Sequence, residues 1–446
     1  MCCLGRLVRA SPDQDFNTSA MRVLILAKRF PPLCCGVGDY ACRMAETLVE
    51  SGELVVVLTE PADTPRHMAI GVREHTLGGW SDLRAVTEQI VGAGPDFVQL
   101  EYSGYAWGRW GVAWWLNALL FSLRGRGIPV RIGLHETAIR MRQHPLQIPV
   151  ALAQWVHIGL MIAAAETVSL NMPSRVETLG RVFPWWRAKL RYRPNSSNIP
   201  VEPMSREERT RFRMERGVRD GQPVVATLGM FHSAKRYEEL VSAIVRIRDA
   251  RTNLWMLGDV GMAAPGYVDD LKAIAHAAGV EGRVWWPGRL EAGNLSRALQ
   301  AADVFVLPQP DGHLTRSGSF MAAAAHGLPV VAVRDPDGRD QVEFTHGKNV
   351  WLVAQSTPEE LANGVDALLK DARLTLELGN NLRQLYEERF DWRVTVGRFQ
   401  AGGTASAVAD APNQGPATFA TGPGGGVSTP AGKARITAAH AGGTKP

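Results

Sequence analysis

The chain has no cysteine after position 42 and no apolar run long enough to cross a membrane. Its five cysteines are Cys2, Cys3, Cys34, Cys35 and Cys42. None of them forms a C-x-x-C pair, and no later cysteine could complete a disulfide framework or a thiolate metal site. We therefore expect reduced thiols, which are usual in cytoplasmic proteins.

The N-terminus also lacks the long apolar core of a secretory signal peptide. A second methionine, Met21, leads straight into the apolar run RVLILA, so we expect residues 1–20 to be a disordered extension or a mis-assigned start. The longest uncharged stretch lies between Arg142 and Glu166 and is interrupted by prolines and polar residues. Such a stretch favours a buried helix over a membrane span, and we expect a cytoplasmic protein.

Charge and composition are those of an ordinary globular protein. Of the 446 residues, 45% are hydrophobic and 21% are charged, with a formal net charge of +5. This length and apolar content can fill two or three domain cores. The mild positive charge suits a partner with phosphates or anionic lipid head groups, but it is too small to indicate nucleic-acid binding.

Short apolar runs alternate with longer helical patterns from Met21 onward. Because the runs are apolar on both faces and β-branched, they indicate parallel strands covered on each side, and their alternation with helices predicts βαβ units. The expected strands are residues 22–27, 54–59, 96–100, 130–134 and 167–170 in the first half, then 224–229, 254–258, 283–286, 303–308 and 329–333. The fold class is therefore α/β, with two Rossmann-like halves.

One interruption divides this series. Prolines, serines and dense charge predict a linker followed by a polar surface helix, and a low-complexity C-terminal segment predicts disorder. The expected organisation is an extension (1–20), a first domain (21–195), the linker and surface helix (196–222), a second domain (223–385), a terminal helix (386–400) and a disordered tail (401–446).

Two candidate sites follow strands of the first half. Gly36 and Gly38 lie in the loop FPPLCCGVGDY, where glycine lets the backbone approach a ligand and a following helix offers free N–H groups. A tight strand-to-helix turn is the alternative. His135 follows the fourth strand, whose carboxyl end should face the ligand crevice of a doubly wound sheet. A structural histidine is the alternative there.

Two further candidates follow strands of the second half. Lys235 begins a helix after a strand and loop, where an ammonium group could neutralise a leaving diphosphate; a solvated surface lysine is the alternative. Gly318 and Ser319 precede a small-residue helix, whose N–H groups and hydroxyls could hold phosphate, and Arg316 could add a forked contact. A simple helix cap would also explain Ser319.

These motifs together resemble the retaining family-4 glycosyltransferases, from Met21 to about Gln400. The first loop, FPPLCCGVGDY, resembles the family's glycine-rich opening, although Cys35 replaces one glycine. The strand end LHE resembles a bacterial branch of the family with His-Glu at this place. Three later segments resemble, in order, the interdomain segment, the diphosphate-binding loop and the aromatic motif of a terminal helix that returns to the first domain: RPNSSNIP, GMFHSAKRY and FDWR.

The resemblance implies the GT-B architecture, with two parallel sheets facing a central cleft, an acceptor-side first domain and a nucleotide-sugar-binding second domain. The activity would be retaining transfer of a sugar from an NDP-sugar to a hydroxyl of a glycan, glycolipid or small-molecule acceptor, in cell-envelope or exopolysaccharide synthesis. His135 would contact the donor sugar and Lys235 would stabilise the leaving diphosphate. The donor is a substrate, so no cofactor is expected, and no acidic cluster resembles a metal site.

Departures from the family pattern affect the donor site. Met230 stands where the family usually has an arginine, and Leu314 and Ala322 stand where it usually has two glutamates, the second of which holds the donor ribose. The pattern TRSGSF resembles a subgroup in which Arg316 and Ser319 take over part of this role. Two other functions stay open: a nucleotide-sugar epimerase on the same scaffold, and a catalytically idle protein that binds nucleotides or sugars.

Tryptophan and arginine concentrate in two segments, residues 105–127 and 184–193. The first holds Trp107, Arg109, Trp110, Trp114, Trp115, Arg124 and Arg126. This combination suits a lipid interface or stacking on carbohydrate. The alternative is that Trp114, Trp115 and Leu119 face the core of an amphipathic helix. We expect weak contact with anionic lipids at the inner face of the membrane.

Overall fold

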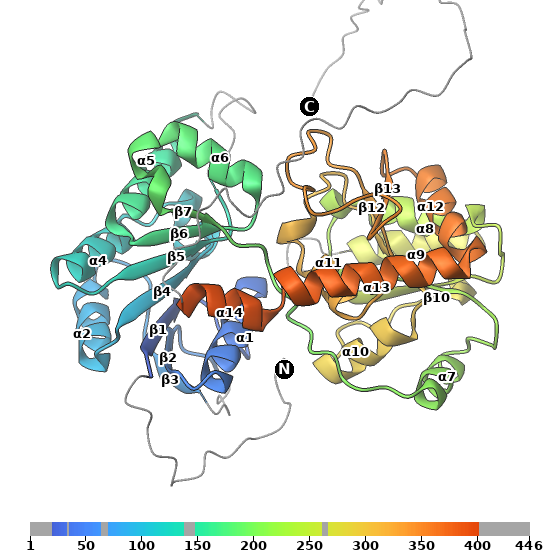
Figure 1. The fold of residues 1–446 in the computed structure, drawn as a ribbon, viewed down its shortest axis with the longest axis horizontal. Coiled ribbons are helices and arrows are strands. Elements are labelled where there is room, and N and C mark those ends of the chain that lie inside the picture. The colour runs from blue at the N-terminus through green and yellow to red at the C-terminus, as the bar shows by residue number, and fades with distance from the viewer. Residues whose placement is uncertain (1–19, 34, 64–69, 138–147, 261–265, 401–446) are drawn as a thin grey trace, which may run out of the picture. The chain divides into compact units, whose positions relative to one another are not determined.

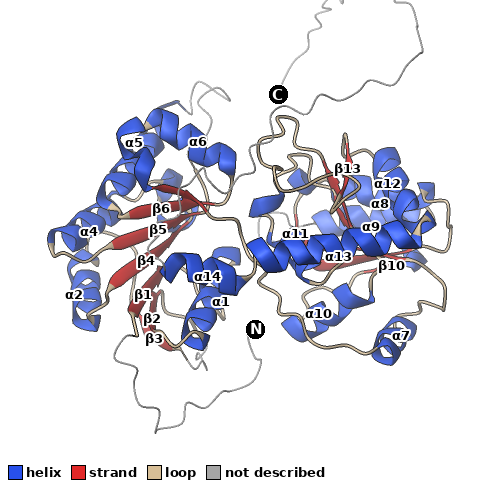
Figure 2. Cartoon of the chain, in the orientation of Figure 1, coloured by secondary structure: helices blue, strands red, loops and turns tan. Residues whose placement is uncertain are grey.

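The computed structural model describes residues 20–33, 35–63, 70–137, 148–260 and 266–400. The expected disordered segments, 1–20 and 401–446, lie outside these ranges except for residue 20. Within them the chain forms two parallel sheets, each covered by helices on both faces (Figure 1, Figure 2). The predicted α/β class with two Rossmann-like domains is confirmed.

The first sheet has the strand order β3-β2-β1-β4-β5-β6-β7, and all of its pairs are parallel. Its strands are β1 (Arg22–Ala27), β2 (Leu54–Thr59), β3 (Gly71–Glu74), β4 (Phe97–Tyr102), β5 (Val130–Leu134), β6 (Thr167–Leu170) and β7 (Leu190–Tyr192). The helices around it are α1 (Gly36–Glu50), α2 (Leu83–Ala93), α3 (Gly104–Trp107), α4 (Trp114–Gly125), α5 (Ile148–Ala164) and α6 (Pro173–Val182), with 3-10 turns at η1 (Arg109–Gly111) and η3 (Pro184–Lys189).

Strand β1 shows why this sheet needs cover on both faces. Successive side chains of a strand point to opposite faces, so Val23 and Ile25 pack toward α1, while Leu24 and Leu26 join the core made with α2, α4 and α5. All four side chains are buried. A strand that is apolar on both faces can only be accommodated between two helical layers.

The second sheet has the order β10-β9-β8-β11-β12-β13, also parallel. Its strands are β8 (Val224–Phe231), β9 (Asn253–Val260), β10 (Val284–Trp285), β11 (Val304–Leu307), β12 (Val330–Val333) and β13 (Trp351–Val353). The helices that follow the first sheet in the chain are α7 (Arg206–Met214), α8 (Tyr237–Ala243), α9 (Tyr267–Ala277), α10 (Ala292–Ala301), α11 (Gly318–Ala325), α12 (Pro358–Lys370), α13 (Ala372–Arg389) and α14 (Trp392–Gln400).

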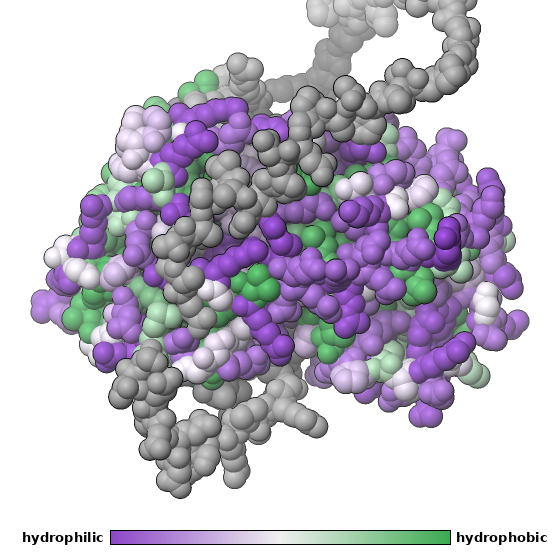
Figure 3. Space-filling view, viewed as in Figure 1, coloured by the Kyte–Doolittle hydropathy of each residue, from purple (hydrophilic) through white to green (hydrophobic). Residues whose placement is uncertain are grey.

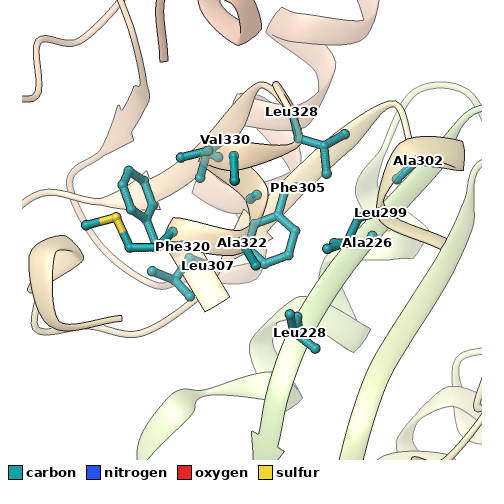
Figure 4. Packing of buried hydrophobic residues seen from close by; sticks show 14 of the residues in the cluster. Ala226, Leu228, Leu299, Ala302, Phe305, Leu307, Phe320, Ala322, Leu328 and Val330 are labelled. Carbon is teal, nitrogen blue, oxygen red and sulfur yellow. The ribbon is translucent and has the colours of Figure 1, made fainter. Parts of the chain in front are cut away.

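The small-residue helix α11 packs closely on this second sheet. Figure 4 shows Phe320 and Ala322 of α11 beside Phe305 and Leu307 of β11, and all four are buried in one hydrophobic cluster. The short alanine side chains let the helix backbone approach the strands, which brings the N-terminus of α11 close to their carboxyl ends. This packing positions Ser319 for the site described below.

Two elements after the first domain have well-defined local causes. Helix α7 begins with a capping box, in which Ser205 and Glu208 satisfy each other's backbone N–H groups. Helix α14 begins after a break at Phe390 and packs on α1, where the Trp392 and Tyr40 rings lie 4.7 Å apart. The Trp392 indole also donates to the carbonyl of Ser197 at 2.6 Å.

Ten of the strands coincide with the predicted runs, to within one or two residues at most ends. Three strands were not predicted: β3, β7 and β13. Each is three or four residues long and lies at the edge of its sheet. An edge strand has a neighbour on one side only and carries a shorter apolar run, as in β3, where Arg73 and Glu74 are exposed. The hydrophobic pattern therefore does not reveal it.

The tryptophan-rich helix is partly core and partly surface. Trp115 and Leu119 are buried, as the core interpretation of α4 requires, but Trp114 is 42% exposed, so for this residue that interpretation is wrong. Helix α5 within the long uncharged stretch likewise buries one face and exposes Leu152 and Val156 on the other. Among the helices at the described positions, none combines the length and the apolarity that a bilayer crossing needs.

Candidate functional site

His135 lies directly after β5 and is held by a buried carboxylate from the neighbouring strand. Its Nε2 is 2.6 Å from Oε2 of Glu101 on β4, and Glu101 is fully buried. The edge of the imidazole ring contacts Tyr40 of α1, with ring centroids 5.0 Å apart. The guanidinium of Arg175, on α6, donates to the His135 carbonyl at 2.7 Å. The histidine is therefore fixed from three elements.

The carboxylate of Glu101 is ionised despite its burial. Burial by itself raises the pKa of Glu101, but the hydrogen bond from His135, the charge of Arg193 and a hydrogen bond from Gln99 outweigh it and lower the pKa below its ordinary value. Gln99 donates to Oε1 at 2.7 Å, and Arg193 lies 3.6 Å from the same oxygen. This is the arrangement that a buried charge requires.

Gly133 makes room for this cluster. A Cβ at this position of β5 would lie 2.2 Å from Oε2 of Glu101 and 3.0 Å from a guanidinium nitrogen of Arg193. The first distance is one that a Cβ atom does not tolerate, and the second would force the guanidinium to move. Glycine in the strand is therefore the condition for bringing a carboxylate and a guanidinium together beside His135.

The two glycines of the first loop have different roles. A Cβ at Gly38 would lie 2.5 Å from the carbonyl oxygen of Arg29, so Gly38 permits close packing of the first turn of α1 on the preceding loop, as the tight-turn interpretation holds. Gly36 is exposed at the first position of α1, with no atom within 4 Å of the place a Cβ would occupy. Of these two glycines, Gly36 is the one that leaves N–H groups of the helix start open to a ligand.

Three polar side chains of the second domain converge over Gly229, near the end of β8. A Cβ on Gly229 would lie 2.8 Å from Nζ of Lys235, 2.8 Å from the hydroxyl of Tyr237 and 3.3 Å from Oγ of Ser319. The glycine has φ +150°, a backbone conformation that L side chains rarely adopt. The absence of a side chain lets an ammonium group and two hydroxyls lie close together over the backbone of Gly229.

A second cation, Arg316, lies near enough to Lys235 to affect its charge. Burial and the nearby charge of Arg316 lower the pKa of Lys235. Arg316 forms an ion pair with Asp311. Burial of Asp311 favours its neutral form, but its hydrogen bond to His313 and the charge of Arg316 outweigh this and lower the pKa of the carboxyl. Two cations with one carboxylate between them leave an excess of positive charge, which favours an anionic ligand.

Helix α11 begins two residues earlier than the helix-cap alternative requires. The cap is Ser317, whose Oγ accepts from the N–H of Phe320 at 3.2 Å, so the interpretation of Ser319 as the cap is wrong. Gly318 is the first residue of the helix and has open space around its Cα. Because Ser317 does the capping, the Ser319 hydroxyl is left to point toward Gly229.

The two positions that usually carry glutamate in the family cannot contact a donor here. Leu314 and Ala322 are both fully buried in the hydrophobic cluster of the second domain, and Figure 4 shows Ala322 among apolar side chains. Met230, by contrast, is 62% exposed at the end of β8. Polar contacts to a ligand at this end of the second sheet would have to come from other residues, such as Lys235 and Ser319 beside Gly229.

A cavity of about 250 Å³ opens beside His135 in the first domain. It is lined by Tyr102, Gly104, Tyr105, Gly111, Glu136, Thr137, Gln154, Ile158 and Arg175. Burial and then the charge of Arg316 lower the pKa of Arg175 to about 10. Glu136 accepts from the Ser103 hydroxyl at 2.8 Å, so the cavity presents one cation, one carboxylate and an exposed tyrosine ring, Tyr105.

The structure thus groups the residues singled out from the sequence. His135 lies beside α1, which Gly36 and Gly38 begin, while Lys235, Arg316, Gly318 and Ser319 surround the end of β8. Arg175 links the two groups: its guanidinium donates a hydrogen bond to the His135 carbonyl, and the charge of Arg316 lowers its pKa. At the described positions no three His, Cys, Asp or Glu residues lie together in a way that could hold a metal ion.

Sequence reasoning did not single out Glu101, Arg175, Tyr237 or Asp311. Of these four, only Glu101 could have been recognised from the sequence. Glu101 and Gln99 are polar residues inside the otherwise apolar strand FVQLEY. A buried parallel strand seldom carries polar side chains unless they have a specific role. The other three lie on helices or loops with ordinary composition. Their roles arise from the fold.

Comparison with known proteins finds a family match for part of the chain. Residues 222–371, which hold most of the second domain, match the family described as glycosyl transferases group 1. An uncharacterised glycosyltransferase of Methanocaldococcus jannaschii is 26% identical over 192 residues, 42% of this chain and 46% of that protein. A GDP-mannose-dependent α-(1-6)-phosphatidylinositol monomannoside mannosyltransferase of Mycobacterium tuberculosis is 27% identical over 218 residues, 46% and 53% of the two chains. The chain thus spans about half the length of these curated relatives.

Solved structures share the fold over nearly the whole described chain. Anabaena HepE, in complex with UDP and glucose, superposes with a TM-score of 0.64 at 18% identity, covering 85% of this chain and 98% of that one. WaaG, a glycosyltransferase of lipopolysaccharide biosynthesis, gives 0.61 at 13% identity, covering 86% and 100%. The two parallel-sheet domains therefore have the GT-B fold of these structures.

Proposed function

We propose that this protein transfers a sugar from an NDP-sugar to an acceptor hydroxyl with retention of anomeric configuration, as family-4 glycosyltransferases do. The observation that carries the proposal is the cluster over Gly229, formed by Lys235, Tyr237 and Ser319, to which Arg316 adds charge. It lies at the carboxyl end of a central strand, where doubly wound sheets bind their ligands. Relatives that match parts of the chain include a GDP-mannose-dependent mannosyltransferase.

In this mechanism the protein acts mainly by positioning and by charge. Negative charge grows on the diphosphate as the glycosidic bond breaks, and Lys235 and Arg316 offset it from fixed positions. The Ser319 hydroxyl and the open N–H groups at the start of α11 add hydrogen bonds to the phosphates. His135 contacts the donor sugar from the first domain, and the start of α1 at Gly36 faces the same ligand. These charges are supplied by side chains, so we propose a metal-independent reaction.

The acceptor is expected in the cavity beside His135. Its volume of about 250 Å³ lies below the range typical of drug-sized ligands, so it suits a single sugar ring or a small polyol. The exposed ring of Tyr105 can stack on a sugar face, while Glu136 and Arg175 can bind hydroxyls. A glycan or lipid-linked acceptor could place its terminal sugar there, in line with a role in cell-envelope or exopolysaccharide synthesis.

The assay that tests this proposal follows NDP release from a panel of NDP-sugars, with and without a cell-envelope extract. We expect release from one or two donors and only with extract, because the reaction needs an acceptor. Conversion of the sugar nucleotide without extract would instead show an epimerase. Binding without either reaction would support an idle protein, the alternative that buried Leu314 and Ala322 favour by removing the usual glutamates.

We further propose that the first domain contacts anionic membrane through one apolar surface, defined by Trp114, Leu152, Val156 and Trp185. These side chains are 42%, 57%, 48% and 69% exposed. Ring contacts join the elements that carry them: Trp114 of α4 contacts His157 of α5, and Trp155 of α5 contacts Phe183, next to η3. By comparison, the face drawn in Figure 3 is mostly hydrophilic, with apolar residues in small separate areas.

Basic residues beside this surface contribute positive charge, which anionic lipids attract. Arg187, Lys189 and Arg191 lie in or next to η3. Replacing Trp114 and Trp185 by serine should reduce cosedimentation with phosphatidylglycerol vesicles several-fold at low salt, since tryptophan anchors at the lipid interface. The control is Trp80→Ser, since Trp80 is 63% exposed and lies outside the surface. Salt-insensitive or unchanged cosedimentation would contradict membrane contact.

A further inference from the structure

Glu101 is a buried charge that the fold does not need. Its backbone pairs with both β1 and β5 as in any central strand, and an apolar side chain would fill the same layer at lower cost. Instead the chain places a carboxylate there and supports it with Gln99, Arg193 and a glycine at position 133. The burial of several polar groups to support one carboxylate indicates that Glu101 has a role other than stabilising the fold.

The two oxygens of this carboxylate have different partners. Oε1 accepts from Gln99 and faces Arg193, which together balance its charge. Oε2 lies 2.6 Å from Nε2 of His135. A carboxylate at this distance can only accept, so Nε2 carries the proton. The tautomer of His135 is therefore set by Glu101 and not by the ligand.

The other ring nitrogen of His135 remains available. Within the described residues Nδ1 has no hydrogen-bond partner, and it is not among the polar atoms sealed in the interior. His157 shows the contrast: its Nε2 bonds to the Tyr102 hydroxyl, while its Nδ1 is sealed without a partner, as in a structural histidine. His135 has one nitrogen anchored and the other open.

We propose that Glu101 is the positioning residue of the site: it holds the His135 ring with Nε2–H toward the sheet and so presents Nδ1 to the donor sugar. In the neutral imidazole Nδ1 is an acceptor, which suits a sugar hydroxyl. The proposal rests on the proposed function in assigning that ligand, but the geometry of the pair does not depend on it. The same logic orients the histidine of carboxylate–histidine pairs in other enzymes.

The test is a double-mutant cycle with Glu101→Gln and His135→Ala, measured as kcat/KM for the best donor. Gln keeps the size of the side chain but removes the charge and allows the amide to face Nε2. We expect Glu101→Gln to lower kcat/KM on the order of 10- to 100-fold, as lost outer-shell partners do, with little change in the Kd of the nucleoside diphosphate. Adding Glu101→Gln to His135→Ala should cost nothing more, because Glu101 acts through the histidine. Additive losses would overturn the proposal.

A spectroscopic measurement keeps the test independent of turnover. In protein labelled with ¹⁵N-histidine, the resonances assigned by His135→Ala should show the Nε2–H tautomer in the wild type and a changed tautomer balance in Glu101→Gln. An Nδ1–H tautomer in the wild type would overturn the inference even in a fully active enzyme. If no donor reacted in the assay, the proposed function would be rejected, but the tautomer of His135 could still be measured. Glu166→Gln, which removes an exposed carboxylate paired with Arg131 at the amino ends of β5 and β6, is the matched control.

Discussion

Replacing Lys235 by alanine should lower kcat/KM for the donor by about 100- to 1,000-fold, the range for loss of one fixed charge at a developing anion. The ammonium group lies over Gly229 beside Tyr237 and Ser319, and its burial means that water cannot replace it fully when it is removed. Arg316 remains nearby but is already paired with Asp311. The measurement is steady-state kinetics with the donor found in the panel assay.

The control for this variant is Lys272→Ala. Lys272 is half exposed on α9 and lies 3.9 Å from Asp269, so its loss removes a surface charge of similar kind with little effect on stability. Thermal unfolding of both variants should match the wild type, which would assign the loss of rate to the site. A fall in kcat/KM of less than about three-fold for Lys235→Ala would contradict the role given to this residue.

Gly258→Ala should destabilise the second domain by about 2–6 kcal/mol, the sum expected from backbone strain and from overpacking. Gly258 pairs with Gly229 in the β8–β9 register and has φ +138°. A Cβ there would lie 2.0 Å from the carbonyl oxygen of Gly229. Because the obstacle is backbone, it cannot be relieved by a side-chain rotation, and urea unfolding should show the loss directly.

The same clash lies beneath the proposed donor site. Displacing the backbone at Gly229 would move the floor on which Lys235 and Ser319 converge, so the folded fraction of Gly258→Ala should also bind nucleoside diphosphate more weakly in calorimetry. Gly282→Ala is the control, since no atom lies within 4 Å of the place its Cβ would take, and its effect should stay within about 0.5 kcal/mol. Equal stability of the two variants would show that the backbones of β8 and β9 can move apart to accommodate the added Cβ.

The positions of the main site residues could be predicted from the sequence, but their partners could not. His135 and Lys235 stand at or just after strand ends, a place that the strand pattern alone identifies. The partners that give them chemical properties were not visible, because they come from elsewhere in the chain: Glu101 from the adjacent strand, and Ser319 from a helix start 84 positions after Lys235. Hydrophobic periodicity reports which side of an element is buried and says nothing about which polar groups meet.

Ser319 shows how a local rule can mislead by a small shift in register. Ser317, Gly318 and Ser319 offer two serines that could cap the helix, and only the position where α11 starts decides between them. That start depends on how the alanine-rich turn packs against β11 (Figure 4). Trp114 and Trp115 form a similar pair, since adjacent positions on a helix differ by about 100° and only the packing of α4 decided which one is buried.

The sequence by itself determined the α/β class, the two Rossmann-like domains and the central strands, because parallel strands covered on both faces must be apolar throughout. It also determined which loops follow those strands, and therefore where a ligand site could lie. Only the tertiary structure decided the edge strands, the cap of α11, the buried Glu101–His135 pair and the convergence over Gly229. These features depend on contacts between segments far apart in the chain, and such contacts carry no periodic signal in the sequence.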